Sequence, residues 1–229
     1  MVLKALLIGG SGTLGKELKK LSNDSLQFHS PSSSECNILN QEQIEKCFRE
    51  IDFDLVIHCA ALTNVTEIEK EPLNAVEVNI IGTINILREC VKHNKKIIFI
   101  STDYVFDGEK GNYSIDDPIN PLSKYAKTKA AAELAVRTYD NSLVIRTSFY
   151  GHSFPYERAF TDQWTSKDYV DLIAPKIVDA VKSDKVGVVH IGSPRRSVYE
   201  IALERRDDVK PIMLNDIDFK IPKDVSLLL

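Results

Sequence analysis

The chain has 229 residues, a formal net charge of −4 and a sequence pI near 5.8. This length predicts one large domain, or one domain with a small appendage, because a domain usually takes roughly 100 to 200 residues. The acidic balance excludes a general electrostatic basis for binding nucleic acid or an anionic membrane, since no basic excess can displace counterions. The apolar start, MVLKALLI, is too short for a signal sequence or a membrane span, so it predicts a first strand.

The four cysteines, at positions 36, 47, 59 and 90, include no Cys-x-x-Cys motif and no cysteine–histidine spacing of the zinc type. We therefore expect no metal site. A reducing cytoplasm is the default compartment for such a chain.

Apolar runs alternate with segments of helical period over residues 1–150. The pattern indicates about six β-α units, and it predicts the α/β class with a doubly wound parallel sheet. We expect strands at residues 3–10, 25–30, 54–60, 95–102 and 141–148, and helices at residues 13–21, 41–51, 74–93 and 122–133.

A glycine-rich loop, GGSGTLG, follows the first predicted strand and opens the first predicted helix. Its spacing fits both Gly10-x-Gly12-x-x-Gly15 and Gly9-x-x-Gly12-x-x-Gly15. In this context the backbone N–H groups at the helix start, those of Thr13 and Leu14, can face a pyrophosphate. Glycines also close ordinary turns, but the position favours dinucleotide binding and a Rossmann-like fold.

Tyr125 and Lys129 lie four residues apart in LSKYAKTKAAAE, a stretch of strong helix formers. On a helix they share one face, one turn apart. A lone pair of this kind is more often part of an ordinary amphipathic helix with a half-buried tyrosine and a solvated lysine. The surrounding segments decide between these interpretations.

Those segments are HCAALTNVTEIEKEP (58–72), Val78-Asn79, STDYVFDG (101–108), NPLSKYAKTKAAAE (120–133) and VIRTSFYG (144–151). With them the chain resembles the extended short-chain dehydrogenases/reductases, and within these the branch of dTDP-4-dehydrorhamnose reductases and related sugar-nucleotide reductases. The resemblance covers residues 1–150 in the family's order.

The resemblance implies an NAD(P)H-dependent reduction of a 4-keto-6-deoxy nucleotide sugar. In the family the tyrosine supplies a proton to the developing alkoxide, a role that falls here on Tyr125. Lys129 would lower the pKa of that phenol and bond the nicotinamide ribose. Thr102 would hold the ketone oxygen, and Ser101 could share this role. A merely structural Ser-Thr pair at a strand end is the alternative.

The resemblance also implies a set of cofactor contacts: Gly9, Gly12, Thr13, Leu14, Gly15, Ser30, Asn37, Ile38, Cys59, Ala60, Ala61, Thr63, Asn79, Tyr125 and Lys129. The alanines and Cys59 end a strand where small side chains let the cofactor approach, although packing alone would also explain them. Asn37-Ile38 stands where relatives have an Asp near the adenine. Asn79 is an amide in an otherwise apolar helix and needs a partner.

Cofactor choice depends on the end of the second predicted strand, QFHSPSSSE. NAD-selective enzymes commonly place a carboxylate there, which repels a 2′-phosphate. Here no carboxylate occurs before Glu35, and Ser30 is among the hydroxyls that could bond a phosphate, but no arginine is present to clamp it. We expect both cofactors to be used, with NADP(H) preferred by about 1 to 2 kcal/mol over NAD(H).

The C-terminal part resembles a shortened form of the family's substrate lobe. We expect residues 1–150 to bind NAD(P) and residues 151–229 to form a small substrate lobe that partly completes the same domain. A nucleoside diphosphate needs cations for its phosphates and a flat surface for its base. The candidates for contacts with the nucleotide-sugar substrate are Ser101, Thr102, Asp103, Tyr104, Gln163, Trp164, Arg195 and Arg196.

Alternatives remain at this level. Arg195-Arg196 is equally typical of a solvated basic loop. The aromatic residues of segment 103–108 are equally typical of packing within a loop. A nucleotide-sugar epimerase or dehydratase uses the same scaffold, although Asp103-Tyr104 differs from the Asp-Glu pair expected of a dehydratase. A non-catalytic NADP-binding regulatory subunit, like the relatives that attach to methionine adenosyltransferase, is the other alternative. The oligomeric state is open, with a homodimer one option.

Overall fold

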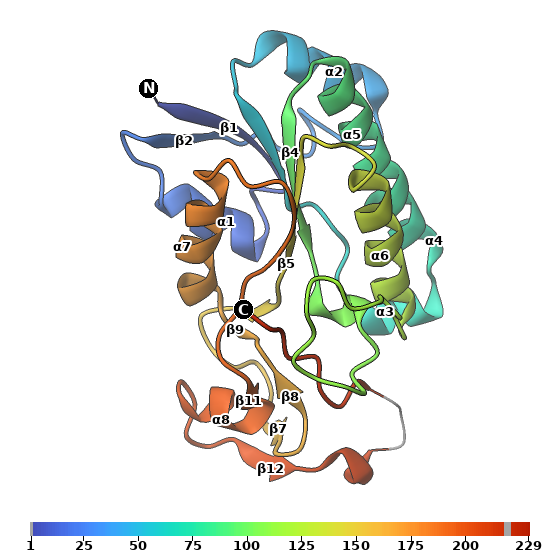
Figure 1. The fold of residues 1–229 in the computed structure, drawn as a ribbon, viewed down its shortest axis with the longest axis vertical. Helices are drawn as coiled ribbons and strands as arrows, with labels where there is room; N and C mark the ends of the chain where they lie inside the picture. Colours follow the sequence, from blue (N-terminus) through green and yellow to red (C-terminus); the bar gives the residue numbers. More distant parts are fainter. Residues whose placement is uncertain (1, 218–220) are drawn as a thin grey trace.

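A six-stranded parallel sheet forms the centre of the protein (Figure 1). The computed structural model describes residues 2–217 and 221–229. The strand order is β10-β5-β4-β3-β1-β2, and every neighbouring pair is parallel. The predicted α/β, Rossmann-like doubly wound fold is therefore confirmed. The strands are β1 (Leu3–Ile8), β2 (Leu26–His29), β3 (Leu55–His58), β4 (Lys96–Ser101), β5 (Ser142–Arg146) and β10 (Gly187–His190).

Five of these strands lie within residues 1–150, so the expectation of about six β-α units there is too high. The sixth strand, β10, comes from the C-terminal part, together with the helix α7 (Val170–Val181) that precedes it. Between β3 and β4 much of the chain forms a single helical run. This run consists of α4 (Leu73–Ala75), a π-helical segment (Val76–Ile81) and α5 (Gly82–Lys92).

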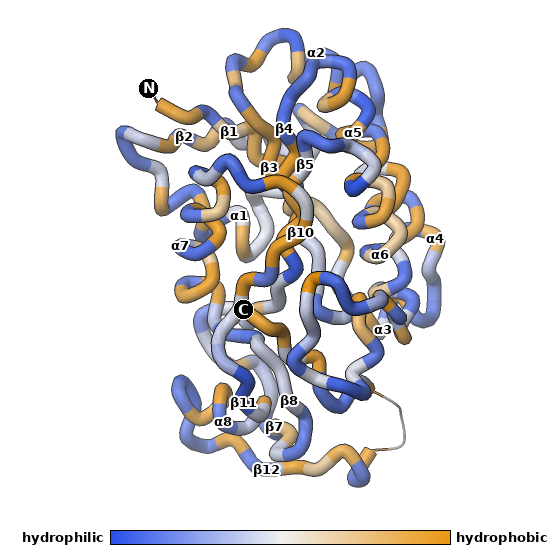
Figure 2. The backbone as a smooth tube through the Cα atoms, in the orientation of Figure 1, coloured by the Kyte–Doolittle hydropathy of each residue, from blue (hydrophilic) through white to orange (hydrophobic). Residues whose placement is uncertain are grey.

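Helices cover both faces of the sheet (Figure 1). On one face α1 (Thr13–Lys20) packs beside α7, and on the other α2 (Gln41–Glu50), α5 and α6 (Lys124–Val136) lie side by side. Two buried apolar clusters correspond to the two faces, and Figure 2 shows the hydrophobic colour concentrated along the strands between them. Because apolar contacts on both faces hold the sheet, the polar residues at its carboxyl end are available for other roles.

A small lobe lies at the carboxyl end of the sheet (Figure 1). Its strands are two or three residues long and pair as β6 with β9, β7 with β12 and β8 with β11. Around β8 and β11 the tube is mostly pale or blue in Figure 2. The lobe's elements are β6 (Phe149–Tyr150), β7 (Arg158–Phe160), β8 (Trp164–Thr165), β9 (Asp168–Tyr169), β11 (Arg196–Ser197), α8 (Val198–Leu203), β12 (Lys210–Ile212) and a 3-10 helix (Leu214–Asp216).

The described end of the chain, residues 221–229, runs between the lobe and the loop at residues 108–113. Asp224 N donates to Gly108 O and Tyr113 N donates to Ser226 O. The remaining elements are α3 (Val65–Lys70), after β3, and a 3-10 turn (Asp103–Val105), after β4. Among the helices of residues 2–217 and 221–229, none combines the length and the apolar character needed to cross a bilayer.

Candidate active site

The glycine loop meets the end of β3 at the carboxyl edge of the sheet. Gly9 has a φ of 91°, and a Cβ there would lie 2.5 Å from Ala60 N. Since β1 is flanked by β2 on one side and β3 on the other, this contact lies at the switch point where doubly wound sheets bind ligands. The sequence-based placement of Cys59, Ala60 and Ala61 beside the loop therefore agrees with the geometry, and all three are half-buried.

Gly12 differs from Gly9 because the fold has room for a side chain there. Its Cβ would meet only Gly9 O, at 3.4 Å, and Gly12 gives α1 no side-chain cap. The N–H groups of Thr13 and Leu14 begin the helix, where backbone dipoles favour an anion. A bare glycine at this point leaves space that a pyrophosphate would fill, so these residues fit a dinucleotide.

The end of β2 lies against the same loop. A Cβ on Gly10 would fall 1.8 Å from Ser30 Oγ, which places Ser30 beside the glycines. The Glu35 carboxylate accepts hydrogen bonds from Ser32 N and Ser32 Oγ, both at 2.7 Å, and these bonds lower the pKa of Glu35. The Glu35 carboxylate is thus bonded within its own loop, to Ser32.

Asn37 and Ile38 have mainly structural contacts. Asn37 Oδ1 accepts from Leu39 N at 3.0 Å, and Asn37 N donates to Gln43 Oε1 at 2.8 Å. Ile38 is buried, and its side chain packs directly against Gly82 of α5. The Asn37 side chain is exposed, so its NH2 group can donate to a ligand. Thr63 is also exposed and lies just beyond Ala60 and Ala61.

Asn79 has a different role from the expected cofactor contact. It is buried in the π-helical segment, where its side chain accepts from Leu62 N at 2.8 Å and donates to Leu62 O at 3.0 Å. It also donates to Thr128 Oγ1 at 3.0 Å, and Thr128 Oγ1 donates to Tyr125 O at 2.7 Å. This correction has a clear physical reason, because backbone and hydroxyl partners occupy the amide. Asn79 joins the loop after β3 to α6.

Thr102 and Asp103 follow β4 and form a buried cluster of hydroxyls around one carboxylate. Thr102 Oγ1 donates to Asp103 Oδ1 at 3.2 Å, and Ser148 Oγ donates to the same oxygen. Thr165 Oγ1 donates to Asp103 Oδ2 at 3.4 Å. Asp103 is fully buried, and burial raises the pKa of its carboxyl against the charge of Lys167. Asp103 is thus bonded to Thr102, Ser148 and Thr165, and its expected contact with a substrate stays a prediction.

Ser101 is also corrected, because it points away from Thr102, as successive strand residues do. Its hydroxyl donates to Glu133 Oε2 at 2.7 Å, and Glu133 is paired with Arg146 at 2.7 Å. Ser101, Glu133 and Arg146 are all buried. Ser101 therefore cannot share the role of Thr102 toward a substrate.

Tyr125 stands at the start of α6, and burial raises the pKa of its phenol, with the Asp103 charge as the next cause. The Thr102 hydroxyl and the Lys167 charge oppose this rise in the pKa. Lys129 lies one turn on, where its Nζ donates to Ile100 O at 2.7 Å and sits 4.1 Å from the centre of the Phe99 ring.

Burial lowers the pKa of Lys129 to about 8, against the charges of Cys59 and Glu133. The expectation that Lys129 lowers the pKa of Tyr125 stays a prediction, and other groups have the larger effects on this pKa here. In this structure the phenol has a raised pKa, and the lysine that opposes the rise is Lys167.

The four lobe candidates hold the lobe together. Gln163 is buried, and its Nε2 donates to Pro222 O at 2.9 Å. Arg195 lies 3.9 Å over the Trp164 ring and pairs with Asp224 at 2.8 Å. Arg196 pairs with Asp168 at 3.1 Å and with Glu204. In this structure Gln163, Arg195 and Arg196 contact other parts of the protein, and the expected role of the four residues as substrate contacts stays a prediction.

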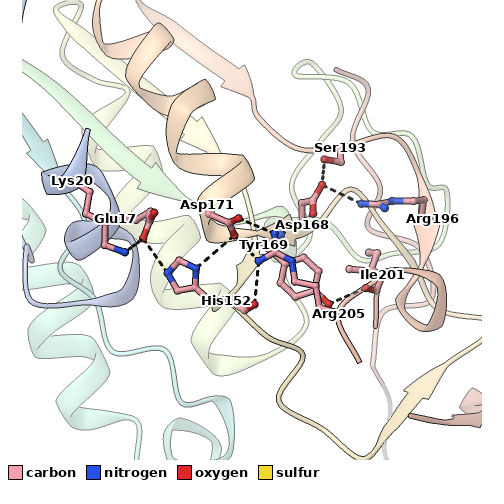
Figure 3. A network of polar contacts seen from close by, with 10 residues as sticks. All are labelled: Glu17, Lys20, His152, Asp168, Tyr169, Asp171, Ser193, Arg196, Ile201 and Arg205. Carbon is pink, nitrogen blue, oxygen red and sulfur yellow. Dashed lines mark hydrogen bonds and ion pairs between the residues drawn. The ribbon is translucent and has the colours of Figure 1, made fainter. Parts of the chain in front are cut away.

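A wider polar network ties the lobe to the glycine-loop helix (Figure 3). His152 lies 3.0 Å from Glu17 of α1 and 3.8 Å from Asp171 of α7. Arg205, after α8, forms two bonds of 2.8 Å to Asp171 and donates to His152 O at 3.0 Å. This network fixes the position of the lobe relative to α1.

Comparison with known proteins identifies the family. The family model described as the RmlD substrate binding domain matches residues 3–204. The chain belongs to this family. The resemblance inferred from the sequence is thereby confirmed.

Individual relatives extend this finding. A dTDP-4-dehydrorhamnose reductase of Aggregatibacter actinomycetemcomitans is 35% identical over 159 residues, 66% of this chain and 54% of the relative. The methionine adenosyltransferase 2 subunit beta of Rattus norvegicus is 30% identical over 142 residues, 58% of this chain and 42% of the relative. The chain thus spans about half the length of the curated relatives it matches.

Among solved structures, a dTDP-4-dehydrorhamnose reductase from Bacillus anthracis in complex with NADP has a TM-score of 0.89 and 26% identity. The match covers 99% of this chain and 90% of that one. The RmlD-family fold is therefore present here almost from end to end.

Three residues of this RmlD-family site were missed from the sequence. Ser148 and Tyr150 lie in VIRTSFYG, a segment that carried the resemblance, so their position was signalled although their contacts were not. Lys167 had no signal, because a single lysine in a loop is usually solvated. Its Nζ lies 5.3 Å from the ring centre of Tyr104 and 4.8 Å from that of Tyr150.

Proposed function

We propose that the protein is an NADPH-dependent reductase of a 4-keto-6-deoxy nucleotide sugar, as in dTDP-rhamnose biosynthesis. One observation carries the proposal: the glycine loop after β1 meets Ala60 after β3, while Thr102 after β4 adjoins Tyr125 on α6. A dinucleotide site and a proton donor thus share one edge of the sheet. The reductase from Bacillus anthracis, bound to NADP, supports the same assignment.

The chain's own residues supply the proton chemistry. A bound reduced nicotinamide would supply the hydride. Tyr125, whose pKa is raised by burial, stays protonated near neutral pH and can donate its phenolic proton to a developing alkoxide. Thr102 Oγ1 donates its one proton to Asp103 Oδ1 in this structure, so its hydroxyl would turn from Asp103 to donate to the same oxygen when the substrate binds. Lys129, with its pKa lowered to about 8, keeps a positive charge beside them below that pH.

The reaction is tested directly with purified protein, NADPH and a dTDP-4-keto-6-deoxy sugar. We expect loss of the NADPH absorbance to depend on the sugar and to yield one reduced sugar per NADPH consumed. A matched reaction with the 4-hydroxy sugar should show no NADPH loss. If the keto sugar is returned unreduced under conditions where NADPH binds, the proposal is wrong.

Cofactor choice follows from the end of β2. Glu35 has the first carboxylate after this strand, and it is hydrogen-bonded to Ser32 within its own loop. Ser30 lies against the glycine loop, where a 2′-phosphate can accept its hydroxyl. We expect NADPH to bind better than NADH by about 1 to 2 kcal/mol, or roughly 5- to 30-fold. Titrations of both under one salt condition measure the ratio, and a tenfold preference for NADH would contradict it.

A non-catalytic regulatory subunit is the second candidate, favoured by the similarity to methionine adenosyltransferase 2 subunit beta and by the short match to the reductases. The presence of Thr102, Tyr125 and Lys129 supports the enzyme instead. Binding of NADPH without turnover of any keto sugar would favour the subunit. A cytoplasmic location, a homodimer and the division at residue 150 stay predictions, and sedimentation measures the oligomeric state.

A further inference from the structure

Lys167 joins the lobe to the catalytic end of the sheet. It lies between β8 and β9, and its backbone N donates to Thr165 Oγ1 at 3.0 Å. Thr165 Oγ1 in turn donates to Asp103 Oδ2 at 3.4 Å, and Asp103 accepts from Thr102. Two hydrogen bonds therefore connect the backbone of Lys167 to the carboxylate that holds Thr102.

The ammonium of Lys167 has aromatic neighbours, and no anion of the described residues is in contact with it. Its Nζ lies over the rings of Tyr104 and Tyr150, at 5.3 and 4.8 Å. Across residues 2–217 and 221–229, no carboxylate oxygen comes within 4.0 Å of it and no acceptor forms a hydrogen bond with it. The side chain is half-buried, so three N–H donors are partly withdrawn from water without a partner.

Its surroundings nevertheless keep Lys167 charged. Burial alone would lower the pKa of Lys167, but Tyr104, Tyr150 and Asp103 outweigh burial and raise it. The cation also acts on Tyr125, where it opposes the raised pKa of the phenol. Lys167 therefore lies within electrostatic reach of the proposed proton donor and remains positive through the neutral range.

The other candidate cations of the lobe are already neutralised. Arg195 is paired with Asp224, and Arg196 with Asp168 and Glu204. An ammonium is a compact charge suited to phosphoryl oxygens, whereas the ketone oxygen already has Tyr125 and Thr102 as donors. A sugar nucleotide bound with its ketone at Tyr125 must place its diphosphate a few bonds away, on the other side of the sugar.

We propose that Lys167 binds the phosphoryl oxygens of the substrate's nucleoside diphosphate, between the rings of Tyr104 and Tyr150. The inference deepens the proposed function and rests on it for the identity of the sugar. It replaces Arg195 and Arg196 as the anion-binding group. The contact is made equally in the ground state and in the transition state, so it contributes to KM rather than to kcat.

The test compares Lys167→Met with Lys210→Met, a substitution of an exposed lysine on β12. We expect Lys167→Met to raise KM for the dTDP-keto sugar by roughly 10- to 100-fold, the worth of a hydrogen bond to a charged group. The inhibition constant of dTDP should rise in parallel, while NADPH affinity stays within about threefold. Lys167→Arg should recover most of the affinity, and Lys210→Met should match the parent.

Each other outcome separates the inference from the function. If KM and the dTDP inhibition constant are unchanged in Lys167→Met, Lys167 binds no diphosphate. A fall in kcat with a shifted pH profile and an unchanged KM would assign Lys167 to Tyr125 and also overturn the inference. If the parent protein reduces no keto sugar, calorimetry with dTDP decides. Weaker dTDP binding by Lys167→Met would then support the anion site although the proposed function has failed.

Discussion

The sheet and the lobe of this protein use charged residues in opposite ways. In the sheet, buried apolar clusters on both faces provide the stability. Among the described residues there, one ion pair has both partners buried, that of Arg146 with Glu133. In the lobe the strands are two or three residues long and the apolar cluster is small, so ion pairs hold the elements together. Charged residues are therefore poor markers of function in the lobe.

The largest expected effect tests the sheet side of the comparison. Tyr125→Phe keeps the ring and removes the proton donor, so kcat should fall by roughly 10²- to 10⁴-fold while NADPH still binds. Tyr139→Phe, just after α6, is the matched control, since its hydroxyl contacts only Asn94 in the hydrogen bonds found. Steady-state kinetics and NADPH titration separate the two results. Parent-level turnover in Tyr125→Phe would remove Tyr125 from the mechanism.

The next prediction compares a sheet ion pair with a lobe ion pair. Glu133→Ala leaves Arg146 buried without a counter-charge, so we expect a loss of about 3 to 5 kcal/mol in the free energy of unfolding. Asp208→Ala breaks the exposed pair with Arg206 and should leave the free energy of unfolding close to that of the parent. Urea unfolding of both variants measures the difference. Equal losses in the free energy of unfolding would contradict the view that the two ion pairs contribute differently to stability.

The pH dependence of the reaction reports on Lys129. Burial lowers the pKa of this lysine to about 8, so the ammonium exists below that pH and the neutral amine above it. If the charge assists the reaction, kcat/KM should fall as the pH rises through about 8, by up to tenfold per unit. Lys127→Ala, an exposed neighbour on α6, should keep this decline. A flat profile between pH 7 and 9 would show that the Lys129 charge is not needed.

The sequence predicted the sheet well because its signals are local. Short apolar runs, a glycine loop and a helix with Tyr125 and Lys129 each depend on neighbouring residues. The order of strands and the sixth strand, β10, depend on pairing with β5, a segment far away along the chain. No local pattern records such a partner, so too many β-α units were expected within residues 1–150.

The site was predicted in its residues but less well in their contacts. Thr102 and Tyr125 adjoin as expected, whereas Ser101 and Asn79 bond to groups brought in from distant elements. Burial and the Asp103 charge raise the pKa of Tyr125, and both are properties of the folded chain that no local pattern records. Lys167 was missed for the same reason.

The smallest expected effect tests the lobe side of the comparison. The guanidinium of Arg195 lies over Trp164 and is paired with Asp224, which also binds Ser226 in the last described segment. Arg195→Ala should therefore cost about 1 kcal/mol of stability, through the lost cation–π contact and ion pair, and change KM for the sugar nucleotide by less than about twofold. Thermal unfolding and steady-state kinetics measure both effects. Arg195→Lys keeps the charge and loses the flat stacking group, so it should fall between the parent and the alanine variant in stability. A tenfold rise in KM with unchanged stability would return Arg195 to the substrate site and would mean that its pairing with Asp224 opens when the diphosphate binds.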